Sequence, residues 1–197
     1  MFLKQLKLTL YHKFYLMKKT TLLAALFLAA TLVFTIDAQA QKFAKMDVSP
    51  MDASAYPSSN RISEKLIKIV YSRPQLKDRE VSKLAPNDRV WRTGANEAAE
   101  ITLYTDMKFG DTMVKAGTYS FFTIPGDKQW TAILNTDTNV WGAYSYNESN
   151  DVARITVPVT MDTSSVEAFS IVFEEVDGTV EMCLGWGKTR VKVPFTK

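Results

Sequence analysis

Cysteine and histidine are nearly absent from this sequence of 197 residues, which has one of each, Cys183 and His12. A single cysteine can neither form a disulfide within the chain nor supply a set of thiolate ligands. Cys183 lies in an apolar, strand-like stretch, so its predicted role is packing rather than reactivity. The sequence therefore predicts no metal site and no cofactor.

The N-terminal residues have the order of a secretory signal peptide. Met17 is followed by two lysines and a mostly apolar run to Ile36, and Ala38-Gln39-Ala40 supplies the small residues that precede cleavage. Residues 1–40 are thus predicted to be a signal peptide, with Met1 or Met17 as its start, and the part before Met17 is expected to carry no fold. An uncleaved membrane anchor is the rival interpretation. The cleavage motif favours removal, a periplasmic or secreted location, and no stable membrane insertion afterwards.

Removal of residues 1–40 changes which chemistries remain open. It takes away His12, which excludes Ser-His-Asp and Cys-His catalysis and histidine-containing zinc sites. Five of the 24 basic residues and one of the 21 acidic residues lie there, so 19 basic and 20 acidic residues remain, a net charge of −1. Nucleic-acid-binding proteins carry a basic surplus, and no nucleic-acid partner is expected.

Convincing amphipathic helices are also lacking, and short strand-like segments separated by turns take their place. Residues 41–60 are polar and aperiodic and are predicted to be a leader that crosses the surface, with the folded domain at 61–197. Residues 76–89 are expected to form a long loop with one short helical turn. Alternating or β-branched segments predict strands at 64–71, 100–105, 107–109, 112–114, 118–124, 130–134, 152–159, 169–174, 180–186 and 189–194.

Glycine-containing turns support this pattern. Gly110-Asp111 and Asp177-Gly178 are two-residue hairpin signals, the second typical of a type I′ turn. Strands with such turns predict an all-β, single-domain fold, a β-sandwich for which a jelly roll is one candidate arrangement.

Several short motifs resemble one family. They are Tyr71-Ser72-Arg73-Pro74, the string VWRTGANE at 90–97, Ala116 to Ser120, Ile124-Pro125-Gly126, and Trp141-Gly142-Ala143-Tyr144. From about residue 49 to its end the chain resembles the domain of unknown function 2911 family of exported bacterial proteins. This resemblance implies export and a single domain, and it assigns no activity. Asp78 and Asp88 stand where such proteins usually have glycine, and both tolerate left-handed turns.

Three interpretations of the VWRTGANE region stay open. In the first, Arg73, Arg79 and Arg92 converge near Asn96 and Glu97, and pairing between an arginine and Glu97 fixes the loop. This is a purely structural role, and it leaves the loop without unsatisfied polar groups.

The second interpretation is a binding module of the cell envelope for a glycan or another small component. Trp91, Trp141, Tyr144 and Tyr146 could provide aromatic platforms, while Arg92, Asn96 and Asp151 could donate or accept hydrogen bonds. The full set of ligand-binding candidates is Arg73, Arg79, Trp91, Arg92, Asn96, Glu97, Tyr119, Trp141 and Tyr144. Trp130 and Trp186 are expected in the core.

The third interpretation is a glycan-processing enzyme. Without imidazole, the remaining route is a carboxylate pair made of Glu97 and one of Asp151, Asp106 or Glu100, with Tyr119 assisting. Glu97 and Asp151 are the catalytic candidates of this alternative.

Overall fold

The structure is a computed structural model that describes residues 2–33 and 41–197. The chain divides into two units, Met1–Lys45 and Met46–Lys197. In the first unit, α1 spans Phe2–Val33, so residues 2–16 belong to the same helix as the predicted signal peptide. The predicted cleavage motif, residues 38–40, lies outside the described residues. Among those described, no helix has the combined length and hydropathy to span a membrane.

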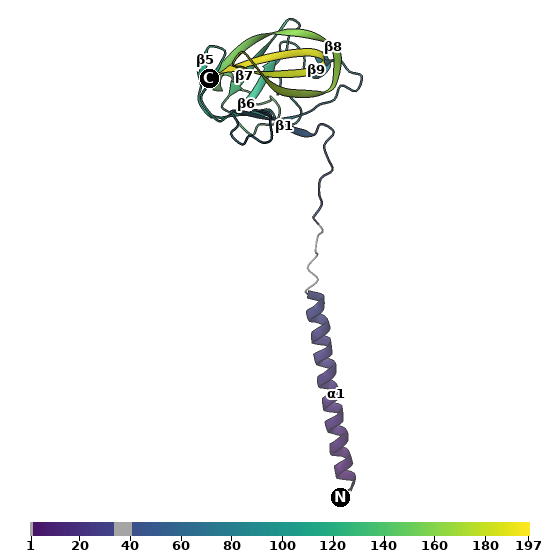
Figure 1. Ribbon diagram of the computed structural model, residues 1–197. Coiled ribbons are helices and arrows are strands. Elements are labelled where there is room, and N and C mark those ends of the chain that lie inside the picture. Colours follow the sequence, from purple (N-terminus) through teal and green to yellow (C-terminus); the bar gives the residue numbers. More distant parts are fainter. Residues whose placement is uncertain (1, 34–40) are drawn as a thin grey trace. The chain divides into compact units, whose positions relative to one another are not determined.

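The second unit, residues 46–197, is built almost entirely of strands (Figure 1). Its two short helical segments are α2 (Val81–Leu84), which is the helical turn predicted in the 76–89 loop, and the 3-10 helix η1 (Glu148–Asn150). The strands are β1 (Met51–Tyr56), β2 (Ile67–Ser72), β3 (Ala99–Leu103), β4 (Met107–Phe109), β5 (Thr112–Val114), β6 (Gly117–Ile124), β7 (Gln129–Asn135), β8 (Asp151–Val176) and β9 (Thr179–Thr196).

All nine strands belong to one antiparallel sheet with the order β1-β2-β3-β6-β7-β8-β9-β4-β5. The prediction of an all-β, sandwich-like fold is confirmed, and the layers are parts of one open, strongly bent sheet. The short alternating segments predicted around 100–134 correspond to β3 to β7. Alternation is clear in β3, where Ala99, Ile101 and Leu103 are buried, whereas β6 and β7 are buried on both faces over residues 120–123 and 132–135.

The strand β1 corrects the predicted domain boundary at residue 61. It pairs with β2 over its whole length, from Met51 opposite Ser72 to Tyr56 opposite Ile67. An edge strand needs only one buried face, so its Asp, Ser and Ala residues lack a strong strand signal. The folded unit therefore includes residues that the sequence assigned to the leader.

The strands β8 and β9 form one long hairpin, which is strongly curved in Figure 1. Asp177 and Gly178 at its tip have φ values of 49° and 77°, as the predicted type I′ turn requires. Its ladder shifts register twice, between Met161 and Val166 and between Val166 and Ser170. The predicted strands 152–159, 169–174, 180–186 and 189–194 are thus two strands, because bulged pairing continues through the polar residues between them.

The bulges allow this hairpin to fold back on itself. Glu181 and Lys192 both belong to β9, and eleven residues of straight strand would separate them by roughly 35 Å. Their side chains instead form an ion pair of 2.7 Å. The hairpin therefore pairs with β7 at one side and with β4 at the other, and its bend brings distant parts of β9 together.

The space between the layers holds the main hydrophobic core. Its centre is a group of aromatic rings in which Trp91 stacks on Trp186 at 5.5 Å and meets Trp130 and Phe169 edge to face. Trp130 and Trp186 are buried, as the sequence predicts. A second, smaller core lies apart from the first and contains Ala98, Phe122 and Ile133.

Candidate functional site

The VWRTGANE segment begins beside β6, where Trp91 forms an isolated bridge with Thr123, and it leads into the start of β3. Trp91 and Thr123 exchange backbone hydrogen bonds of 2.7 and 2.9 Å. Gly94 packs against β2 so closely that a Cβ there would lie 2.9 Å from the carbonyl oxygen of Ser72. The glycine of the motif is therefore required by a backbone contact.

Two residues of this segment have left-handed backbones. Asn96 has φ 62°, which asparagine tolerates, whereas Thr93 has φ 52° and is β-branched. Thr93 is fully buried, and its hydroxyl bonds with that of Thr123 at 3.1 Å. Such a backbone costs of order 1–3 kcal/mol and persists only where the surroundings enforce it. The strain lies directly beside Arg92.

Residues 96–98 pair with the middle of the loop that joins β7 to β8, residues 136–150, called here the β7–β8 loop. The amide of Gly142 donates to the carbonyl of Asn96 at 2.9 Å, and that of Ala98 donates to Val140 at 3.0 Å. Glu97 and Trp141 form an isolated antiparallel bridge. Their side chains therefore lie on the same face of the pair.

The β7–β8 loop presents two aromatic side chains to solvent. Trp141 is 60% exposed and Tyr144 is 84% exposed. Gly142 lies between them with φ +67°, and a Cβ on it would lie 2.7 Å from Tyr144 Cε2 and 3.2 Å from Arg92 Nη1. Tyr144 and Arg92 thus both pack against Gly142.

Arg92 is partly buried and lacks an acceptor. Its Nε is buried, and among the described residues no oxygen accepts a hydrogen bond from this guanidinium. The expected pairing of Glu97 with an arginine is wrong, because Glu97 is exposed and forms no ion pair in the described part of the chain. The segment is instead held by backbone bonds, by Gly94 and by Thr93.

The other two arginines have structural partners of their own. Arg73 bonds with the Phe169 carbonyl, with Ser170 Oγ at 2.7 Å and with Asp52 at 3.1 Å, and so joins the end of β2 to β8. Arg79 donates to the carbonyls of Leu76 and Gln75. No contact in the described structure brings either to Arg92, so the predicted convergence of the three arginines is not observed.

The remaining aromatic candidates differ in exposure. Trp91 is 6% exposed and belongs to the main core, so it offers no open face. Tyr119 is partly buried, and its hydroxyl donates to the Lys115 carbonyl at 3.0 Å. Trp141 and Tyr144 are therefore the exposed aromatic candidates, and they lie three residues apart on the β7–β8 loop.

The buried carboxylate of Asp151 holds the C-terminal end of the β7–β8 loop through hydrogen bonds. The Asp151 side chain, 7% exposed, accepts hydrogen bonds from Asn135 at 2.7 Å, Tyr146 at 2.6 Å and Arg154 at 2.6 Å. The pKa of Tyr146 is raised to about 12, first by burial and then by its hydrogen bond to Asp151. Tyr146 also packs on Phe122 of the smaller core.

Asn135 and Arg154 were not among the residues selected from the sequence. In the sequence, the signal for Asn135 is a polar amide directly after the apolar residues of β7. In the structure, this amide is fully buried. Buried polar side chains need partners, so such a residue predicts a network nearby.

The carboxylates considered for catalysis are mostly engaged elsewhere. Glu100 accepts from the Asn139 amide at 2.6 Å. Asp106 accepts from Lys115 and from the Ala116 amide, both at 2.8 Å, and the Lys115 ammonium holds the pKa of this carboxyl below its usual value. Asp151 has the three partners described above. Glu97 alone among these four has no hydrogen-bonded partner in the described structure.

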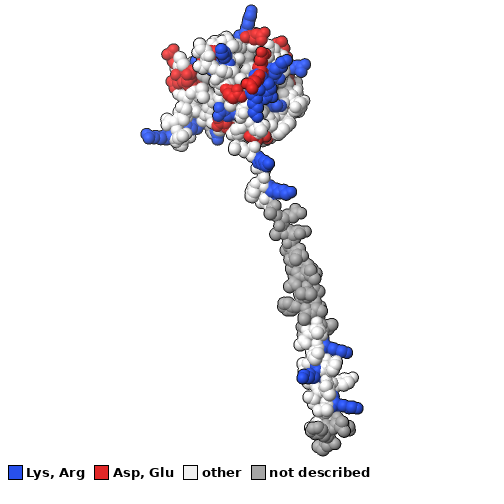
Figure 2. Space-filling view, turned by 90° about the vertical axis from the view of Figure 1, so that its right-hand side faces the viewer, with Lys and Arg blue, Asp and Glu red and all other residues white. Residues whose placement is uncertain are grey.

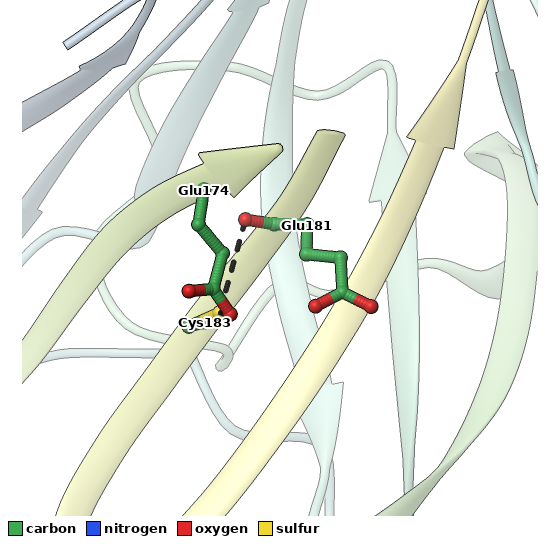
Figure 3. Close-up of side chains that lie close together, drawn as sticks. All are labelled: Glu174, Glu181 and Cys183. Atoms are coloured by element: carbon green, nitrogen blue, oxygen red, sulfur yellow. Dashed lines mark hydrogen bonds between the residues drawn. The ribbon is translucent and has the colours of Figure 1, made fainter. Parts of the chain in front are cut away.

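A second group of side chains lies on β8 and β9. Ligand atoms of Glu174, Glu181 and Cys183 lie within 4.8 Å of one another (Figure 3). Lys192 Nζ contacts Glu174 at 2.6 Å and Glu181 at 2.7 Å, so it already balances one of the two negative charges of this group. Cys183 is half-buried rather than part of the core, and burial together with Glu174 raises the pKa of its thiol to about 12.

Acidic and basic side chains are interspersed on the surface. On the face shown in Figure 2, blue and red residues of the second unit lie side by side. Ion pairs such as Arg190 with Asp162 and Arg154 with Glu148 account for part of this mixture.

Comparison with known proteins identifies the family. A family model described as "Protein of unknown function (DUF2911)" matches residues 49–195. The chain belongs to this family. No curated protein and no solved structure matches it.

The two positions that depart from the usual DUF2911 pattern retain the backbone that glycine would allow. Asp78 has φ 62° and Asp88 has φ 58°, both left-handed. Aspartate adopts this region more readily than most residues, so the turns survive the loss of glycine. The DUF2911 motif at 90–97 is explained by the contacts of Trp91, Thr93 and Gly94.

Proposed function

We propose that the protein is an exported binding module of the cell envelope that holds a glycan against the β7–β8 loop. The observation that carries this proposal is the pair of exposed aromatic side chains, Trp141 and Tyr144, on one loop with a fixed backbone. The pattern of residues 17–40 supports export. In this proposal the polar groups beside the rings are Arg92 and Glu97.

The chemistry of sugars fits such a surface. A pyranose ring has an apolar C–H face that packs on an aromatic ring, and hydroxyl groups at its edge that need hydrogen-bonding partners. The loop is supported by the Asp151 network and by its pairing with residues 96–98, so little ordering is required on binding. A preformed surface loses less conformational entropy when a ligand binds.

Binding to chitotetraose, a neutral oligosaccharide of N-acetylglucosamine, tests the proposal. Isothermal titration calorimetry should detect binding to the wild type, and Trp141→Ala should weaken it about tenfold, equivalent to about 1.4 kcal/mol. The matched control is Tyr104→Ala. Tyr104 is another exposed aromatic residue, at 53%, and it follows the opposite end of β3. Equal affinities for Trp141→Ala and the wild type would contradict the proposal.

A further inference from the structure

Arg92 differs from the other partly buried arginines of the second unit. Arg73 and Arg190 each contact a carboxylate as well as carbonyl oxygens. Arg92 has a buried Nε and no acceptor among the described residues. A buried donor without a partner is costly and rare in native proteins. The structure thus contains a guanidinium whose hydrogen-bonding capacity is unused.

We propose that Arg92 binds a carboxylate of the ligand, which makes the ligand an acidic glycan containing a uronic acid. This inference rests on the proposed function, because it places the acid group of the sugar beside the exposed ring of Tyr144. Arg92 Nη1 and the ring of Tyr144 both lie against Gly142, so one ligand can contact both. The terminal nitrogens of arginine match the two oxygens of a carboxylate.

The local charges favour a carboxylate over a phosphate. Glu97 is exposed and forms a bridge with Trp141, the neighbour of Gly142, so this part of the surface already carries one negative charge. A phosphate monoester carries nearly two charges and usually binds several cations or a set of backbone amides. One guanidinium beside one carboxylate is suited to a singly charged group.

The backbone around Arg92 holds it in place. Its neighbours Trp91 and Thr93 are both buried, Trp91 in the main core and Thr93 in a strained left-handed conformation. Backbone strain of this kind clusters at binding sites because it fixes a side chain before the ligand arrives. Arg92 can therefore act on a ligand without a prior rearrangement of its segment.

Two tetrasaccharides provide the test. One alternates glucuronic acid with N-acetylglucosamine, and the other is the same molecule with its carboxylates reduced to alcohols. The chain is expressed in full and the purified product is titrated in low salt. The wild type should bind the acidic form at least tenfold more tightly, since a hydrogen bond to a charged group is stronger than one to an alcohol.

The variants Arg92→Gln and Arg89→Gln separate the site from general charge effects. Arg89 is an exposed arginine three residues earlier in the same segment. We expect Arg92→Gln to bind both sugars with equal affinity and Arg89→Gln to keep the preference of the wild type. Arg92→Lys, which retains the charge, should keep part of the preference, and it replaces Arg92→Gln if that variant does not fold.

The outcomes distinguish this inference from the proposed function. Equal binding of both sugars by the wild type, or an unchanged preference in Arg92→Gln, overturns the role of Arg92 and leaves the proposed function standing. If neither sugar binds, acetate is titrated while the side-chain NMR signal of Arg92 Nε–H is followed. A saturable shift then supports an anion site and overturns the glycan proposal, whereas no shift overturns both.

Discussion

Gly142 and Arg92 are in close contact although fifty residues separate them in the chain. A Cβ at position 142 would lie 3.2 Å from Arg92 Nη1, and Gly142 also has the φ of +67° that favours glycine. The contact joins the VWRTGANE segment to the β7–β8 loop. It is the point at which the DUF2911 motif and the exposed aromatic rings meet.

Substitution of Gly142 should destabilise the protein by more than the cost of its left-handed backbone angle alone. Gly142→Ala would place a methyl group 2.7 Å from Tyr144 Cε2, so the ring must move. Gly178→Ala is the matched control, because Gly178 has φ +77° and nothing within 4 Å. Urea denaturation should show a loss of about 1–2 kcal/mol for the control, and a larger loss for Gly142→Ala. Equal losses would show that the contact of Gly142 with Tyr144 and Arg92 does not contribute to the free energy of unfolding.

The buried carboxylate of Asp151 should be a major source of stability for the β7–β8 loop. Asp151→Asn removes the charge that Arg154 and Tyr146 contact at 2.6 Å and leaves Arg154 with a weaker acceptor. We expect the free energy of unfolding to fall by about 2–4 kcal/mol, because Asn135, Tyr146 and Arg154 lose the charged acceptor that they share. Asp162→Asn, at a more exposed ion pair with Arg190, should cost much less. Similar losses in urea denaturation would contradict this account.

Tyr146 should make stability depend on pH in the alkaline range. Its pKa is about 12 in the folded protein, against 10 for an ordinary tyrosine. Between pH 10 and 12 the unfolded chain therefore loses this proton while the folded chain keeps it. The stabilisation is complete below pH 10 and is lost as the pH rises towards 12.

Denaturation midpoints at pH 9, 10 and 11 can test this behaviour. Tyr146→Phe should show a smaller decrease over the range than the wild type, because its side chain has no proton to lose. Tyr144→Phe removes a hydroxyl from the same loop at an 84% exposed position and should follow the wild type. A Tyr146→Phe curve parallel to the wild type would mean that this hydroxyl is not linked to folding.

Cys183 should react slowly with alkylating reagents. Its thiol has a pKa of about 12, first because of burial and then because of the neighbouring Glu174, so very little thiolate is present at pH 8. Iodoacetamide should modify the native protein much more slowly than the urea-unfolded chain. Glu174→Gln should accelerate the native reaction, since it removes the negative charge, and Glu148→Gln, a remote exposed glutamate, should not. Rapid native alkylation at pH 8 would refute the proposed thiol environment.

The sequence predicted the central strands well because β3 alternates between buried and open residues, and because β6 and β7 are short runs rich in β-branched and aromatic residues between turns. It failed at β1, where an edge position tolerates Asp52, Ser54 and the flanking prolines, and at the bend of β8, where polar residues continue the ladder through bulges. The local pattern of polar and apolar residues does not show which strand an irregular strand pairs with. These elements depend on long-range pairing, which a single sequence leaves open.

The candidate site was predicted only in part for a similar reason. Residue types identified Arg92, Trp141 and Tyr144 as chemically suitable, but they could not show that Trp91 is buried while Trp141 is exposed. Charge alone predicted that Glu97 pairs with one of the three arginines. This prediction failed because backbone bonds to the β7–β8 loop hold Glu97 at the surface without such a pair.

The smaller core of Ala98, Phe122 and Ile133 lies apart from the aromatic interior of the sheet. Replacements at positions 141 and 144 should therefore affect mainly the β7–β8 loop and leave the main hydrophobic core unchanged. Related proteins could alter these two side chains, and with them the molecules they recognise, without redesign of the scaffold. The same separation makes the β7–β8 loop a suitable place to engineer binding of other ligands.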